Sequence, residues 1–174
     1  MEEENSPGTV QDVELGEEEA EPDFDHLFGV ITDGFVGAVG GAVGTAIVTV
    51  GLLVARTFGA FEMTAFAELA EMTGTVVFYP QHPVAVGYFV FLAGGMVVWP
   101  LLFASAGSYL PGDRFATRGI TFGAVIWTGF AMAFYDPSFW LPGYVFFTLV
   151  AHLGYGFGLG AVFDYLSTRP DTLV

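Results

Sequence analysis

Long runs of apolar residues alternate along this chain with short polar segments. Four of the runs approach the roughly 20 residues that a helix needs to cross the hydrocarbon core of a bilayer. The pattern predicts membrane-spanning helices at about residues 34–56, 84–108, 115–135 and 141–165. Backbone amides within lipid must be satisfied inside each segment, so helices are the structure expected there. The sequence therefore predicts an all-α fold, a bundle of four transmembrane helices.

A shorter periodicity lies between the first two runs. Apolar side chains recur at helical spacing, with glutamates beside them, at Phe58, Phe61, Ala65, Leu69 and Met72. An apolar stripe next to acidic residues is typical of a helix that lies on the membrane surface. We expect a short interfacial amphipathic helix between spans one and two.

The two ends of the chain differ from the apolar middle. Residues 1–28 are acidic and carry few bulky apolar side chains, which predicts a disordered tail. No positively charged segment precedes an apolar run there, so this tail does not have the pattern of a signal peptide. The predicted organisation is the tail, a membrane domain over residues 29–167, and a short polar tail over residues 168–174.

Charge is sparse and unevenly placed. The chain has 19 acidic and four basic residues, a net charge of -15, and 12 of the acidic residues fall within residues 1–33. Such a balance argues against nucleic acid as a partner, because phosphate binding needs a basic surface. Abundant carboxylates without any lysine suggest a halophilic host, since high salt screens their repulsion. Cysteine is absent, which excludes disulfides and thiol chemistry.

The arginines set the expected orientation. With four spans, Arg114, Arg118 and Arg169 share one side of the membrane with both termini, and Arg56 alone marks the other side. The positive-inside rule then places both termini in the cytoplasm. We expect a multi-pass protein of the plasma membrane, with the lipid bilayer as its first partner.

Glycines four residues apart form the strongest local pattern. Pairs at this spacing share one face of a helix and let another backbone come close, which is a main source of helix association in lipid. The expected packing glycines are Gly37, Gly40, Gly41 and Gly44 in the first span and Gly154, Gly156, Gly158 and Gly160 in the fourth. The spacing favours packing within the chain and leaves contacts with another protein open.

Two further positions stand out inside the spans. Pro100 lies within the second apolar run and should kink it near residues 94–100, because proline cannot donate to the carbonyl four residues back. His152 lies near the middle of the fourth span, with Tyr155 three residues later, and an ionisable group at that depth is a functional candidate. It could contact a haem, a quinone or a proton path, or it could be neutral and hydrogen bonded to Ser105, Thr121 or Thr128 of another helix.

Signatures of catalysis are not visible. No histidine and acidic residues stand at metal-ligand spacing, and no serine has a visible His/Asp arrangement, so we expect no metal site and no catalytic residues. A second histidine at membrane depth, which bis-histidine haem would need, is missing. The chain is therefore expected to be no enzyme and to carry no cofactor of its own.

The fourth span resembles the closing helix of a family of small four-helix prokaryotic membrane proteins of unknown function. The matching pattern T-L-x-x-H-x-x-Y-G-x-x-L-G runs from Thr148 to Gly160, and W-P-L-L-F at Trp99 and L-P-G at Leu110 also fit. The resemblance covers about residues 30–166 and implies the four-helix membrane fold. The acidic tail departs from this pattern and resembles an addition found in salt-loving organisms. Some members of the family from salt-loving archaea are labelled as linked to terminal oxidases.

Three functions follow as hypotheses. The first is an integral membrane protein without catalytic activity, as an accessory subunit of a larger, respiratory membrane complex or associated with itself. The second is a small oligomeric channel or transporter. The third is a haem- or quinone-associated redox protein that uses His152.

Overall fold

The computed structural model describes residues 24–167, and most of this part of the chain is helical, without a β-strand. The prediction of an all-α fold is confirmed. The predicted tail over residues 168–174, Arg169, and most of the predicted acidic tail lie outside the described residues. The elements are α1 (Phe24–Thr57), α2 (Ala65–Met72), the 3₁₀-helix η1 (Thr75–Phe78), α3 (Pro83–Ala93), the π-helix η2 (Gly94–Val98), α4 (Trp99–Ala106), the 3₁₀-helix η3 (Gly107–Tyr109), α5 (Phe115–Ala133) and α6 (Leu141–Ser167).

Three helical segments are long and apolar enough to cross a membrane, where the sequence predicted four. They are Gly34–Thr57, Pro83–Tyr109 and Leu141–Leu166, of 24, 27 and 26 residues. The remaining predicted span corresponds to α5, which has 19 residues. Arg118 lies in its first turns and lowers its mean hydropathy. Length and composition thus support three of the four predicted spans.

The first and second spans differ in detail from the prediction. Helix α1 begins at Phe24, inside the segment that the sequence predicted to be disordered. No proline separates that residue from the apolar run, so the sequence does not interrupt a helix there. The second span is not one uniform helix, because the π-turn of η2 separates α3 from α4.

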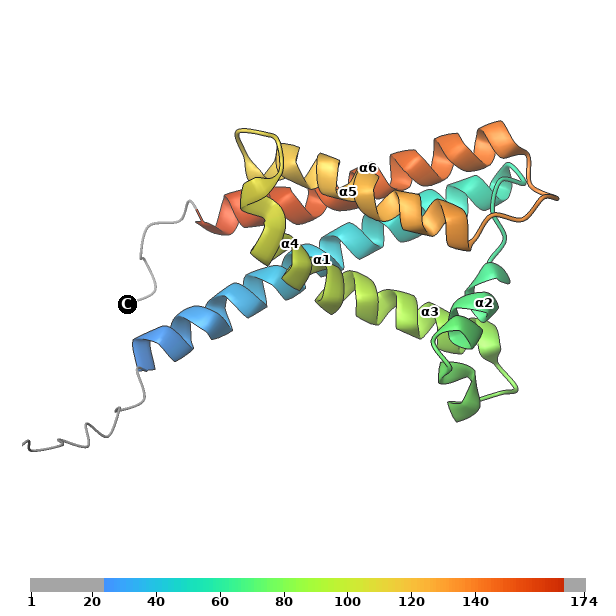
Figure 1. Ribbon diagram of the computed structural model, residues 1–174, viewed down its shortest axis with the longest axis horizontal. Coiled ribbons are helices and arrows are strands. Elements are labelled where there is room, and N and C mark those ends of the chain that lie inside the picture. Colours follow the sequence, from blue (N-terminus) through green and yellow to red (C-terminus); the bar gives the residue numbers. More distant parts are fainter. Residues whose placement is uncertain (1–23, 168–174) are drawn as a thin grey trace, which may run out of the picture.

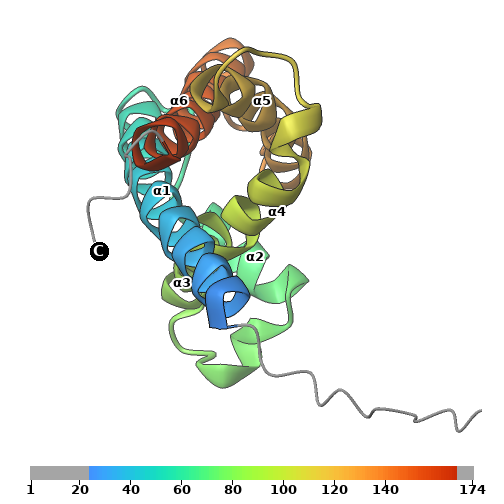
Figure 2. The ribbon, with the colours of Figure 1, turned by 90° about the vertical axis from the view of Figure 1, so that its left-hand side faces the viewer.

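Helix α6 packs against α1 on one side and α5 on the other. Around the bundle axis, α1, α6, α5 and α4 follow one another (Figure 2). The second span closes the ring through contacts of η2 and α4 with α1. The first turns of α1 extend beyond the other helices, and α2 lies beside α3 at the opposite end (Figure 1).

The predicted interfacial segment forms a helix only over Ala65–Met72. The chain turns away from α1 at Gly59, which has a positive φ of 64°. This turn brings Phe61 into the core, so the segment does not continue as a surface helix. Phe66 is fully buried, and its carbonyl lies where a side chain on Gly87 of α3 would have to be. Helix α2 is therefore packed onto the bundle through its apolar face.

Aromatic clusters join the helices at both ends of the bundle. Near α2, the Phe66 ring lies 5.1 Å from that of Phe91 in α3 and 6.4 Å from that of Phe134, just after α5. At the other end, the Phe103 ring of α4 lies 5.2 Å from Phe122 and 5.4 Å from Phe163. Edge-to-face and tilted rings contribute beyond their buried area, which matters in lipid, where apolar burial alone does not hold helices together.

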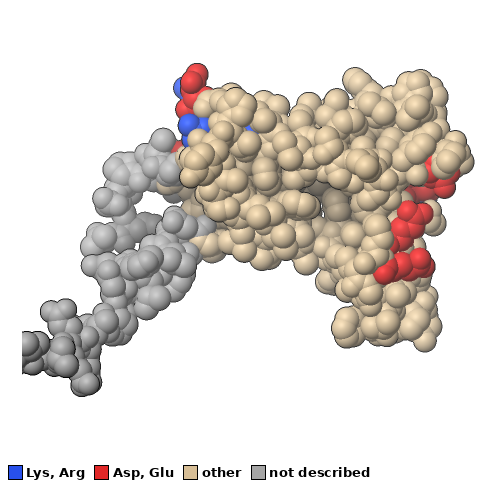
Figure 3. Space-filling view, viewed as in Figure 1, with Lys and Arg blue, Asp and Glu red and all other residues tan. Residues whose placement is uncertain are grey.

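Charged side chains of the described region lie at the two ends of the bundle, and a wide uncharged band separates them (Figure 3). Asp164, near the end of α6, accepts the N–H groups of Phe115 and Ala116 at 2.9 Å each and so caps the start of α5. At the other end, Asp136 accepts the N–H of Ser138 at 2.7 Å. Hydrogen bonds from Ser138 lower the pKa of Asp136, so the stability this turn contributes is complete above the ordinary aspartate pKa and is lost as pH falls through the lowered one.

Candidate functional site

The two candidate site residues lie together in the interior. His152 and Tyr155 are one turn apart on α6 and are 4% and 2% exposed. The His152 ring lies 4.5 Å from the ring of Phe130 in α5. Both side chains are thus buried inside the bundle, between the aromatic clusters at its two ends.

A ladder of hydrogen bonds along α6 leads to His152. The Thr148 hydroxyl donates to the Tyr144 carbonyl at 2.6 Å and accepts the indole N–H of Trp127 at 2.9 Å. His152 Nδ1 lies 2.7 Å from the Thr148 carbonyl, which can only accept, so this nitrogen carries the hydrogen. The expected hydrogen bond from His152 to Ser105, Thr121 or Thr128 of another helix is wrong, because the ring bonds to the Thr148 carbonyl of its own helix. Ser105 and Thr128 donate to carbonyls of their own helices.

The second ring nitrogen of His152, Nε2, has no hydrogen-bond partner among the described residues. In the neutral imidazole with a hydrogen on Nδ1, Nε2 is an acceptor. Thr45 Oγ1 is the one unpaired polar side-chain atom of the described residues that is fully enclosed, so Nε2 keeps some accessible surface. His152 lines two cavities.

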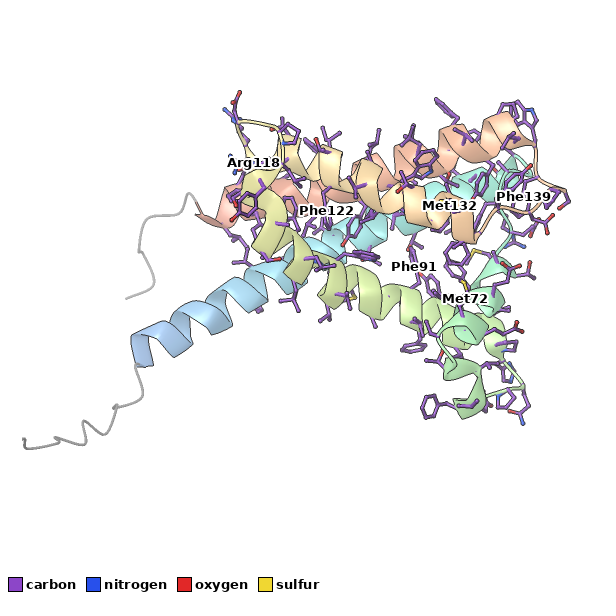
Figure 4. The ribbon with its side chains drawn as sticks, in the orientation of Figure 1. Met72, Phe91, Arg118, Phe122, Met132 and Phe139 are labelled. Carbon is purple, nitrogen blue, oxygen red and sulfur yellow. The ribbon has the colours of Figure 1, made fainter. Side chains whose placement is uncertain are left out.

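The larger cavity is a cleft of about 430 Å³, bounded by α2, α3, η2 and α5 with α6 at its base. His152 is the only ionisable residue in its wall. Its other lining residues are Leu69, Met72, Thr73, Val90, Phe91, Gly94, Val98, Trp99, Ile126, Gly129, Phe130, Ala133 and Phe134. The surface is hollowed at this place (Figure 3), and Phe91 and Met72 come from the α3 and α2 sides of it (Figure 4).

The cleft opens at the outer surface and ends inside the bundle. Val98 and Met72 in its wall are 51% and 58% exposed, whereas Phe130, Phe134 and His152 are buried. His152 also lines a second cavity of about 30 Å³, together with Gly95 and Tyr155. The histidine thus belongs to the walls of both an apolar cleft and a small, mostly apolar cavity.

The π-turn in the second span changes the hydrogen bonding of Gly95, which lines this small cavity. In an α-helix the Gly95 carbonyl would accept the N–H of Trp99, but that N–H donates to Gly94 instead. The amide one residue further on belongs to Pro100, which has no hydrogen to give. The Gly95 carbonyl is left without a donor in its own helix, and the Tyr155 hydroxyl donates to it at 2.8 Å. Pro100, predicted to kink the span, thus lies at the end of a π-turn.

The eight glycines singled out from the sequence face neighbouring helices to different degrees. A Cβ on Gly40 or Gly44 would come within about 3 Å of Leu159 or Tyr155 in α6, and one on Gly41 would meet η2 and Pro100. Gly154 and Gly158 face Ile47 of α1. Gly156 and Gly160 lie against the backbone of α5, whereas Gly37 has only ordinary contacts, with Pro100 and Phe163.

Other close-approach glycines were missed. A side chain on Gly119 or Gly123 of α5 would overlap the carbonyls of Gly156 or His152, and one on Gly95 would overlap Thr45. The first two are four residues apart, so the spacing rule that selected α1 and α6 could also have found them. The sequence contains no comparable pattern for the aromatic wall of the cleft, because its residues come from separate helices.

Among the described residues, no three histidine, aspartate or glutamate side chains gather where they could hold a metal ion. Neither the curated proteins nor the solved structures contain a match to this chain. The model of one protein family, described as a family of unknown function (DUF6789), matches residues 31–174. This match spans most of the chain, including all the residues around the cleft, and the chain therefore belongs to the family of unknown function DUF6789.

Proposed function

We propose that this protein is a multi-pass membrane protein that binds a lipid-soluble molecule in the cleft beside His152. The single observation that carries the proposal is the cleft itself. It is apolar, it opens between α3 and α5 on the uncharged band, and it ends at one ionisable side chain with an unpaired ring nitrogen. Small-molecule sites have this form, a mostly apolar pocket with a few polar groups that fix the orientation of the ligand.

The same proposal includes α5 as a fourth span. Helix α5 runs alongside α6, and glycine backbones on both helices approach closely at Gly119 and Gly156. A 19-residue helix is about 28 Å long at 1.5 Å per residue, close to the thickness of the hydrocarbon core. If α6 crosses the membrane, α5 lies at the same depth, with Arg118 near its end.

Cysteine labelling tests this topology, since the chain has no cysteine of its own. Gln81→Cys and Ser138→Cys should react with a membrane-impermeant maleimide in intact cells, because four spans with cytoplasmic termini put both residues outside. Ser108→Cys should react only after permeabilisation. Labelling of Ser138→Cys together with Ser108→Cys, and not with Gln81→Cys, would show that α5 does not cross the membrane.

Filling the cleft tests binding. A Cβ on Gly129 would have nothing within 4 Å, although the residue lines the cleft, so Gly129→Leu should occupy the cleft without disturbing the helices. We expect a photoreactive alkyl diazirine added to membranes to attach to Phe91, Phe130 and Phe134, and this labelling to fall at least about tenfold in Gly129→Leu. Mass spectrometry of peptides measures the adducts.

The control is Gly34→Leu, a glycine with equally open surroundings that lies outside this cleft. Its labelling should match that of the unaltered protein. Adducts spread evenly over all lipid-facing helices, with no loss in Gly129→Leu, would contradict a binding cleft. The roles as an accessory subunit and as a channel stay predictions from the sequence; recovery of partner subunits from native membranes tests the first.

A further inference from the structure

We infer that the molecule in the cleft carries a hydroxyl on an aromatic head group and donates it to His152 Nε2. This inference rests on the proposed function, because it names the class of molecule that the cleft binds. It follows from three features of the inner end of the cleft: which polar atoms are there, which of their hydrogens are already used, and what surrounds them.

His152 and Tyr155 have no hydrogen left for a ligand. His152 gives its Nδ1 hydrogen to the Thr148 carbonyl, and Tyr155 gives its hydroxyl hydrogen to the Gly95 carbonyl. What remains for a ligand is the lone pair of His152 Nε2, and a lone pair on the oxygen of Tyr155, which lines the smaller cavity together with His152. Two acceptors call for a donor, so a hydroxyl fits here and a ketone or an ester carbonyl does not.

The other polar side chains of the cleft do not change this conclusion. The Thr73 hydroxyl donates to the Leu69 carbonyl at 2.7 Å within α2. Trp99 lines both cavities with His152, and its indole N–H, near Gly94, is a donor from which a ligand hydroxyl oxygen can accept. A hydroxyl can donate to His152 and still accept a hydrogen bond, whereas a group that only accepts leaves Nε2 unpaired at a cost in free energy.

The walls around His152 favour a flat ring. Phe91 and Trp99 line the α3 side of the cleft, and Phe130 and Phe134 line the α5 side. Aromatic rings pair with a further ring in stacked or edge-to-face arrangements, which adds to the apolar burial. The exposed mouth at Val98 and Met72 leaves room for an alkyl tail to continue into the bilayer. The expected ligand is thus a phenol or hydroquinone with an apolar tail.

A pair of probes that differ in one hydrogen-bond donor tests the inference. Para-octylphenol and its methyl ether, para-octylanisole, have the same ring and tail, but only the phenol can donate. Each should compete with the photoreactive diazirine for the purified protein in nanodiscs, the phenol at about a tenfold lower concentration, as expected for one hydrogen bond to a buried acceptor. In His152→Phe the two probes should compete equally.

A second measurement keeps the test independent of whether His152→Phe folds. With ¹⁵N-labelled histidine, the phenol should shift the Nε2 resonance of His152 in the unaltered protein, and the ether should not. Equal competition by both probes, with both lost in Gly129→Leu, would overturn the hydroxyl inference and leave the binding cleft standing. If neither probe competes and Gly129→Leu changes nothing, the proposed function fails and the inference fails with it.

Discussion

Replacing Gly156 with alanine should force α5 and α6 apart and lower the free energy of unfolding by about 3 kcal/mol. The new methyl group would overlap the carbonyl of Gly119, and the reverse substitution, Gly119→Ala, would overlap the carbonyl of Gly156. Backbone atoms cannot turn away as a flexible side chain can, so the helices themselves have to move. Unfolding of the purified protein in mixed micelles, followed by far-ultraviolet circular dichroism, measures the loss.

The double variant sharpens this result. Once one alanine has separated the helices, the second should add little, so the two effects should be far from additive. Gly129→Ala is the matched control on α5, because its Cβ would meet open space. It should be as stable as the unaltered protein, or slightly more stable because alanine favours helix. If Gly156→Ala were as stable as Gly129→Ala, α5 and α6 would not be in backbone contact.

The contact at Gly156 shows how much of the fold can be predicted from the sequence. Helical spans follow from uninterrupted apolar runs, because lipid leaves the backbone no other way to pair its amides. The spacing of Gly156 and Gly160 predicted a close contact, but a spacing names only one of the two surfaces that meet. The partner, α5, is known only from the structure, although Gly119 and Gly123 repeat the same spacing.

The candidate site was only partly accessible from the sequence. His152 stood out because an imidazole at membrane depth is rare, and that argument needs no neighbours. Its surroundings needed the structure. The cleft depends on where α3 and α5 leave space between the aromatic clusters. The hydrogen bond from Tyr155 to the Gly95 carbonyl depends on a π-turn that a proline alone does not specify, since proline in a span can equally produce a simple kink.

Because of the π-turn, we expect a second large loss of stability in the variant Tyr155→Phe. Removal of this hydroxyl should lower the free energy of unfolding by about 2 kcal/mol, because it leaves the Gly95 carbonyl buried without any donor. Tyr144→Phe is the control. Its hydroxyl lies 3.3 Å from the Ala131 carbonyl and 3.4 Å from that of Phe130, and the latter already accepts the N–H of Phe134. The same unfolding measurement should therefore show a smaller loss for Tyr144→Phe.

Pro100→Ala tests the cause of this effect. Alanine restores an amide hydrogen at residue 100, the position from which a π-turn would donate to the Gly95 carbonyl. In that background Tyr155→Phe should cost less than about 1 kcal/mol, and the cost of Tyr144→Phe should not change. Residues 100 and 155 would then be coupled because each can donate a hydrogen bond to the same Gly95 carbonyl oxygen. Equal costs of Tyr155→Phe with and without the proline would mean that the hydroxyl stabilises the bundle by packing, and that the Gly95 carbonyl finds its donor elsewhere.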